Sequence, residues 1–214
     1  GATVVYDGAA HGATGTATSA DGVTDLSGLL NLGDSFTDVP GGTANWTFAG
    51  DANHIAANGT AEIEIGKAPS VTAVTINGGP FTYSGAAVTP ATVSVTGAGG
   101  LNLTPAAVYA NNVNAGTATA SYSYAGDANH EPSADSKDFG IGKASATIAV
   151  AGATVVYDGA AHGATGTATG ADGVTDLTAL LNLGDSFTDV PGGTASWTFA
   201  GDANHIAANG TAEI

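Results

Sequence analysis

Residues 43–54 read Thr-Ala-Asn-Trp-Thr-Phe-Ala-Gly-Asp-Ala-Asn-His, and this stretch decides the fold. In its first half, Ala44, Trp46 and Phe48 alternate with polar residues, which is the period-two pattern of a β-strand with one buried face. Its second half is rich in Gly, Asp and Asn, the residues that form turns. The stretch therefore predicts a strand that ends in a tight turn.

The same stretch returns along the chain. The string Ala-Gly-Asp-Ala-Asn-His occurs at residues 49–54, 125–130 and 200–205. Further out, residues 1–63 and 152–214 align without a gap and differ at only four positions. A motif Ile-Gly-Lys-Ala closes one copy and opens the next at Ile65 and again at Ile141. The chain therefore consists of three tandem copies of one repeat, of which the middle copy has diverged.

The repeat predicts three domains, with boundaries near Lys67 and Lys143. They cover residues 1–67, 68–143 and 144–214. By comparison with the other copies, the first lacks its first strand and the third is truncated at its end.

Other segments of each copy also show strand patterns. Alternation predicts strands at residues 60–65, with Ala61, Ile63 and Ile65 inward, and at 117–124. Two β-rich runs follow at Thr147–Val150 and Thr154–Tyr157. The large aromatic residues in the apolar phase of these strands are predicted to point into the core of their own domain: Trp46, Phe48, Tyr122, Tyr124, Trp197 and Phe199.

We expect an all-β fold of three small immunoglobulin-like β-sandwich domains in tandem, since each copy holds six or seven short strands. The alternative is a β-grasp-like unit with one short helix. Residues 25–32 have leucines at helical spacing, and Thr104–Ala107 offers a helix start in which Thr caps and Pro takes the first position.

The composition excludes several classes of function. The net charge is −16, with 19 acidic residues against 3 lysines and no arginine. Such a surface repels phosphates and anionic lipids, so we expect no nucleic-acid partner. No apolar run is long enough to cross a membrane, so we expect no membrane insertion of this segment. Without cysteine, disulfides, thiol catalysis and thiolate zinc sites are excluded.

The Gly-Asp-Ala-Asn-His loop is the one candidate for a metal site. Asp and Asn oxygens two residues apart suit a hard cation such as Ca²⁺. The weak Ca²⁺ candidates are Asp51, Asn53, Asp127, Asn129, Asp202 and Asn204. The preferred interpretation is an Asx-type turn that closes the hairpin, because Ca²⁺ needs about six or more oxygens. We therefore expect no metal and no cofactor.

Other residues with chemical potential have simpler interpretations. The five histidines, at residues 11, 54, 130, 162 and 205, are expected at the surface or at edges, and no repeated His–Ser–Asp order supports a triad. Trp46 and Trp197 are expected in the core in preference to a sugar-stacking surface. Nothing near Lys67 and Lys143 singles out an isopeptide partner. We expect no catalytic residues and no enzyme activity.

The order of motifs resembles the MBG/YDG-type repeats of large bacterial surface proteins. The resemblance rests on Tyr-Asp-Gly at residue 6, Val-Pro-Gly-Gly-Thr-Ala at 39, Trp-Thr-Phe-Ala-Gly-Asp-Ala-Asn at 46 and the closing Ile-Gly-Lys-Ala, and it covers nearly the whole chain. It implies a β-rich module, repeated along exported and often adhesin-like proteins, without catalytic residues. His54, His130 and His205 depart from the tyrosine expected after Asp-x-Asn.

These observations favour a non-enzymatic spacer or stalk segment of a bacterial cell-surface or secreted adhesin-like protein, which extends a terminal domain from the cell. The expected location is extracellular, and the expected partners are the neighbouring repeats of the same chain, with a glycan or host protein bound through domains outside this segment. Without a flexible linker between copies, the repeats are expected to form a fairly stiff rod. The alternative is a multivalent module that binds carbohydrate or protein.

Overall fold

The computed structural model describes residues 1–214 and is all-β, with 48% of the residues in strands and no helix of seven or more residues. The all-β prediction is confirmed, whereas the three immunoglobulin-like sandwiches stay a prediction. The chain forms two compact units. Unit 1 comprises residues 1–75, 92–107 and 121–136, and unit 2 comprises residues 76–91, 108–120 and 137–214. Each unit therefore combines a terminal copy with part of the middle copy.

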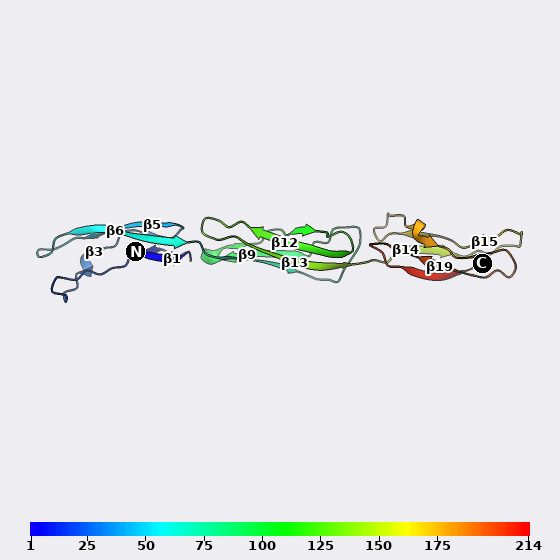
Figure 1. Ribbon diagram of the computed structural model, residues 1–214, viewed down its shortest axis with the longest axis horizontal. Coiled ribbons are helices and arrows are strands. Elements are labelled where there is room, and N and C mark those ends of the chain that lie inside the picture. The colour runs from blue at the N-terminus through cyan, green and yellow to red at the C-terminus, as the bar shows by residue number, and fades with distance from the viewer. The chain divides into compact units, whose positions relative to one another are not determined.

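The first copy, in unit 1, is built around a long antiparallel pair. β5 and β6 pair in register from Gly41↔Glu64 to Phe48↔Ala57, and β1 adds to β6 in parallel (Figure 1). The sheet order is β1-β6-β5-β3, and β2 pairs with β4 separately. The strands are β1 (Ala2–Val5), β2 (His11–Gly12), β3 (Leu30–Asn31), β4 (Ser35–Phe36), β5 (Gly41–Phe48) and β6 (Ala57–Gly66).

The middle copy contributes two sheets, with orders β10-β9-β7 and β11-β12-β13-β8. Its short strand β8 pairs in parallel with β13, as β1 does with β6 in the first copy. The strands are β7 (Ser70–Ile76), β8 (Phe81–Thr82), β9 (Ala91–Gly97), β10 (Asn102–Leu103), β11 (Val108–Ala110), β12 (Gly116–Tyr124) and β13 (Ser133–Gly142).

The third copy, in unit 2, repeats two sheet arrangements of the first, has no counterpart of β1, and adds a strand pair that includes its opening segment. β14 pairs with β16, β15 with β18, and a third sheet has the order β17-β19-β20. The strands are β14 (Thr147–Ala151), β15 (His162–Gly163), β16 (Thr165–Thr169), β17 (Leu181–Asn182), β18 (Ser186–Phe187), β19 (Thr194–Phe199) and β20 (Ala208–Glu213). No helix in the structure has the length and apolar character needed to cross a membrane.

The core follows the predicted alternation. Ile63 and Ile65 of β6 are buried and lie against Ala44 of β5, while Glu62 and Glu64 face solvent. Of the six aromatic residues predicted to point inward, Phe199 and Tyr124 are buried. The other four, Trp46, Phe48, Tyr122 and Trp197, are only half-buried. The small core therefore relies on aliphatic side chains as much as on aromatic ones.

The helical segments are shorter than the leucine spacing suggested. Ser27–Leu29 (η1) and Thr178–Leu180 (η3) form single 3₁₀ turns. The helix start that the alternative fold offered at Thr104–Ala107 does not form, and these four residues are an irregular connection from β10 to β11. The middle copy instead has a 3₁₀ turn at Ala98–Gly100 (η2).

One predicted strand does not form. Thr154–Tyr157 is not a strand, although the equivalent Ala2–Val5 is β1. The difference is in the pairing: β1 pairs in parallel with Ile63–Gly66 of β6, and Thr154–Tyr157 takes part in no strand pairing. A strand of this length needs a neighbour to satisfy its backbone.

Candidate functional site

The Asp-Ala-Asn-His loop lies at the junctions between copies, where it forms what we call the inter-repeat joints. Joint 1 connects the first and middle copies near Lys67 and lies within unit 1. Joint 2 connects the middle and third copies near Lys143 and lies within unit 2. Neighbouring repeats were expected as partners, but no sequence pattern indicates which residues meet.

The aspartate shapes the loop. Asp127 Oδ1 accepts hydrogen bonds from the backbone N–H of Asn129 (2.8 Å) and of His130 (2.7 Å). Asp51 and Asp202 do the same in their own copies. The Asx-turn interpretation is therefore confirmed. These hydrogen bonds, together with those from side chains, hold the pKa of Asp127 below its usual value, with the Tyr124 hydroxyl (2.8 Å) as the largest contribution.

The backbone of the next residues carries the joint itself. At joint 1, the Ala68 N–H donates to the Asn129 carbonyl (2.9 Å), and the Glu131 N–H donates to the Ala68 carbonyl (2.8 Å). At joint 2, Ala144 makes the same pair of bonds with the Asn204 carbonyl and the Ile206 N–H, both at 2.9 Å. The connecting segment is thus held on the loop by a short parallel bridge.

The asparagine side chain reaches back to the preceding copy. Asn129 Oδ1 accepts a hydrogen bond from the Val39 N–H (3.0 Å), and Asn129 Nδ2 donates to Asp38 Oδ1 (2.8 Å). In joint 2, Asn204 Oδ1 accepts from the Ala115 N–H (2.9 Å), and Asn204 Nδ2 donates to Asn114 Oδ1 (3.2 Å). Both polar atoms of the amide are therefore hydrogen-bonded. The oxygen accepts from a backbone N–H, and the nitrogen donates to a side-chain oxygen.

A tyrosine from the preceding copy packs against the histidine. The rings of Tyr6 and His130 meet edge to face, with centroids 5.3 Å apart and an interplanar angle of 81°. Tyr83 and His205 repeat this geometry at 5.3 Å and 84°. Parallel strand pairing places each tyrosine: the Tyr6 N–H donates to the Gly66 carbonyl (2.9 Å), immediately before Lys67.

His130 and His205 are therefore buried, which corrects the expectation that these two lie at the surface or at edges. His130 is 4% exposed and His205 is 2% exposed. The side chain of His54, which has no tyrosine packed against it, is 28% exposed. His11 and His162 occupy another place, where each Nε2 lies 2.9 Å from the carboxylate of Asp7 or Asp158.

The two joint histidines differ in their hydrogen bonds. His130 Nδ1 faces the Asp127 carboxylate (2.9 Å), and its Nε2 faces the Ala98 carbonyl (2.9 Å). Both partners are acceptors, so both ring nitrogens must carry protons. His205 Nε2 instead accepts a hydrogen bond from the Ala171 N–H (3.1 Å). Burial lowers the pKa of His130, but the hydrogen bonds to Ala98 and Asp127 outweigh it and raise the pKa above its ordinary value.

The boundary lysines also belong to the joints. Lys67 Nζ donates to the Asp127 carbonyl, and Lys143 Nζ donates to the Asp202 carbonyl. Each ammonium group thus closes the connecting segment onto the loop of the copy that follows. The sequence does not indicate a partner for these lysines, because every residue type has a backbone carbonyl that can accept such a hydrogen bond.

The Ca²⁺ candidates are accounted for by this geometry. The three aspartates hold their turns, and Asn129 and Asn204 hold the joints, while Asn53 is exposed. No group of three or more His, Asp or Glu side chains is placed to hold a metal ion.

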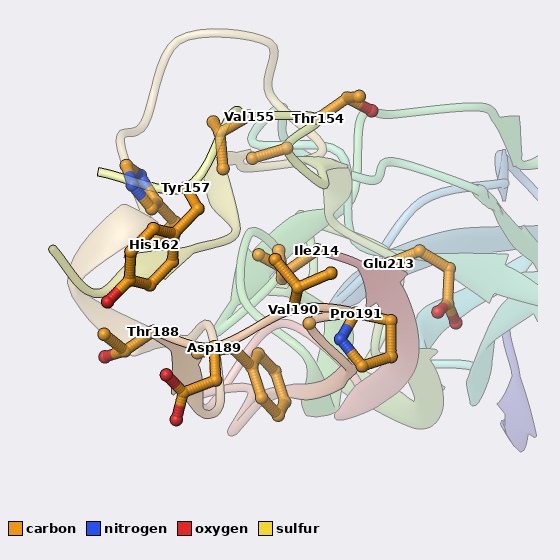
Figure 2. A pocket seen from close by; sticks show the side chains of 13 residues that line it. Thr154, Val155, Tyr157, His162, Thr188, Asp189, Val190, Pro191, Glu213 and Ile214 are labelled. Carbon is orange, nitrogen blue, oxygen red and sulfur yellow. The ribbon is translucent and has the colours of Figure 1, made fainter. Parts of the chain in front are cut away.

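The surface equivalent to the tyrosine side of a joint is open in the third copy. A hollow of about 330 Å³ there is lined by Tyr157, Asp189, Val190, Pro191 and Ile214, among other residues (Figure 2). Tyr157 is 61% exposed and Val190 is 77% exposed, whereas the equivalent Tyr6 and Val39 are half-buried in joint 1.

Comparison with protein-family models, with curated proteins and with solved structures finds no match to this chain. The joints therefore rest on the geometry described above.

Proposed function

We propose that this chain is a non-enzymatic structural spacer, a stalk segment of a bacterial cell-surface or secreted adhesin-like protein that carries a terminal domain away from the cell. The observation that carries the proposal is the recurrence of one joint. Two junctions between copies use the same set of groups, namely a lysine, an asparagine amide, a histidine ring and a tyrosine ring. A spacer that holds a terminal domain at a set distance needs junctions of fixed geometry. A series of independent binding domains does not need them.

The proposal includes the finer architecture, in which each copy is a small immunoglobulin-like sandwich. It is supported by buried side chains that pack together from different strands, such as Ala44 and Ile63 in the first copy. The alternative function, a multivalent carbohydrate-binding module, needs the same aromatic surface on every copy. Trp46 and Trp197 do not supply it, because both are half-buried and the middle copy has Tyr122 at this position.

Backbone ¹⁵N relaxation on the intact chain tests the spacer. If the joints hold, the three copies tumble together, and the rotational correlation time of each is well above that of one free copy. Double substitution Asn129→Ala and Asn204→Ala should shorten the correlation time of each copy. Asn53→Ala is the matched control, since the same loop in the first copy makes no joint in this chain. Copies that tumble independently in the unsubstituted chain would refute the proposal.

A further inference from the structure

Each joint contains one further contact, between a loop of the preceding copy and a turn of the following copy. The loop reads Tyr-x-Gly-Ala-Ala, at residues 6–10 in the first copy and 83–87 in the middle copy. The turn, which we call the tip, reads Thr-Gly-Ala-x-Gly, at residues 96–100 in the middle copy and 169–173 in the third copy. Only the residue marked x differs between the two loops, and the same is true of the two tips.

The glycine of the loop touches the variable residue of the tip in both joints. At Gly8 in joint 1, an added Cβ would lie 2.6 Å from Gly99 Cα. At Gly85 in joint 2, an added Cβ would lie 2.7 Å from Asp172 Cβ. Both distances are too short for a real Cβ, so the loop backbone lies directly against the tip. The variable residue of the loop precedes this glycine in the chain and therefore lies beside the contact.

Each joint holds one aspartate at these two variable positions. Joint 1 combines Asp7 of the loop with Gly99 of the tip, and joint 2 combines Ser84 of the loop with Asp172 of the tip. The asparagine contact follows the same division, since its side-chain acceptor is Asp38 in joint 1 and an asparagine in joint 2. At the positions that differ, acidic side chains therefore come only from the preceding copy in joint 1 and only from the following copy in joint 2.

The first and third copies, which we call the first type, are acidic at both positions. Their loops carry Asp7 and Asp158, and their tips carry Asp21 and Asp172. The middle copy is neutral at both positions. A joint between two copies of the first type would therefore place an aspartate on each side of the contact.

These aspartates are ionised at neutral pH. Asp172 accepts hydrogen bonds from the Thr175 hydroxyl and from the backbone N–H groups of Thr175 (2.9 Å) and Val174 (3.0 Å), which lower its pKa to about 2. A hydrogen bond from the Ala9 N–H (2.8 Å) is the main cause of the lowered pKa of Asp7. Like charges placed opposite one another at an interface disfavour that pairing.

We propose that charge decides which copies can join: a copy of the first type joins a copy of the middle type and pairs weakly with another copy of its own type. The middle copy joins the third because its loop has Ser84 where the first copy has Asp7. The partner that fits an acidic loop is therefore a repeat with a neutral tip, and the partner that fits an acidic tip is a repeat with a neutral loop. This inference rests on the joints and not on the spacer function, so its failure would leave that proposal standing.

The test gives the loop side of joint 2 the charges of the first copy within the intact chain. Ser84→Asp adds the loop aspartate, and Asn114→Asp adds the second acid while keeping an oxygen that accepts from the Asn204 amide. The readout is the opening equilibrium of joint 2, measured by hydrogen exchange of the Ala144 and Ile206 amides. In about 10 mM NaCl, we expect the double variant to raise this equilibrium at least about threefold.

Three controls separate charge from shape. Ser84→Asn adds bulk without charge and should leave the opening close to that of the unsubstituted chain. Asp172→Asn, added to the double variant, removes the opposing charge and keeps an oxygen that can hold the tip, so it should restore most of the closed joint. In about 1 M NaCl, where the screening length is roughly 3 Å, the effect of the double variant should largely disappear.

Unchanged opening in the double variant would overturn the charge rule. An increase that Ser84→Asn reproduces, that Asp172→Asn leaves in place or that persists in about 1 M NaCl would overturn it as well. Hydrogen exchange in β19 reports whether the third copy stays folded in each variant, which separates opening of the joint from loss of the fold.

Discussion

At the residue scale, one asparagine side chain in each joint makes two hydrogen bonds to the preceding copy. Its carbonyl oxygen takes a backbone N–H, and its amide nitrogen meets Asp38 in joint 1 but Asn114 in joint 2. The two joints are therefore equivalent in geometry and different in charge. This difference makes the asparagine a sensitive probe, because Asn→Asp changes charge with almost no change in shape.

We predict that Asn129→Asp opens joint 1. The new carboxylate would face Asp38 at hydrogen-bond distance and could not donate, so attraction becomes repulsion. Hydrogen exchange of the Ala68 and Glu131 amides should accelerate by about tenfold or more. Asn204→Asp should affect joint 2 less, since the Asn114 amide can rotate to donate. Asn53→Asp serves as the control. Equal effects at both joints would contradict the assigned contacts.

The protonation of His130 predicts a pH dependence of joint 1. The pKa of His130 is raised in the folded chain, so its stabilisation is present below the unfolded pKa of about 6.5 and is lost as pH rises through the folded value. The groups facing the ring are Asp127, Lys67, Tyr6 and the Ala98 carbonyl. Exchange-corrected opening of joint 1 should therefore increase as the pH rises above about 6.5 and through the raised, folded-state pKa of His130. An NMR titration of His130 that gives a pKa below 6.5 would contradict this.

At the element scale, the strands were largely readable from the sequence, and their pairing was not. Period-two alternation located β5, β6 and β12, because each has one buried face, and β14 coincides with a β-rich run. The segment Thr154–Tyr157 is identical in sequence to residues 3–6, most of which form β1, and it is not a strand, because it has no paired neighbour. Secondary structure in such short strands depends on the neighbour as well as on local preference.

The joints could be located from the sequence but not described. The string Ala-Gly-Asp-Ala-Asn-His persists unchanged in the diverged middle copy, which marks it as constrained, and the sequence supports the turn that its Asp forms. Asn129 contacts Asp38 and Val39, and His130 packs against Tyr6. Each of these partners lies about 90 residues or more earlier in the chain. Contacts at such separations leave no local pattern, so the burial of the histidines was missed.

The first and third copies provide a matched pair for core packing. Phe199 is covered by the segment that opens the third copy, whereas Phe48 lacks that cover. Phe199→Ala should destabilise the third copy by roughly 3–5 kcal/mol. Phe48→Ala should cost clearly less in the first copy. Chemical denaturation followed by residue-resolved NMR distinguishes the copies, and equal losses would show that the opening strand contributes nothing to burial.

At the scale of the whole molecule, charge is the dominant feature. The 19 acidic residues face only 3 lysines, and two of these lysines are engaged with carbonyl groups at the joints. Several aspartates accept backbone hydrogen bonds in exposed turns, and those to Asp21 from Thr24 and Val23 lower the pKa of Asp21 to about 2. The acidic groups therefore stay ionised across the ordinary pH range and repel one another.

This repulsion predicts that salt stabilises the chain. Between about 10 mM and about 150 mM NaCl, the screening length falls from roughly 30 Å to roughly 8 Å, which removes most of the long-range repulsion in the folded state. The free energy of unfolding should rise by on the order of 1 kcal/mol, measured by urea denaturation at neutral pH.

CaCl₂ at the same ionic strength separates screening from binding. Because the Asp-Ala-Asn-His aspartates already accept backbone N–H groups, Ca²⁺ should add no saturable increment beyond that of NaCl. A saturable calcium effect that Asp127→Asn or Asp202→Asn removes would place a cation at the joints and contradict this prediction, and stability that falls as NaCl increases would refute the role of charge repulsion.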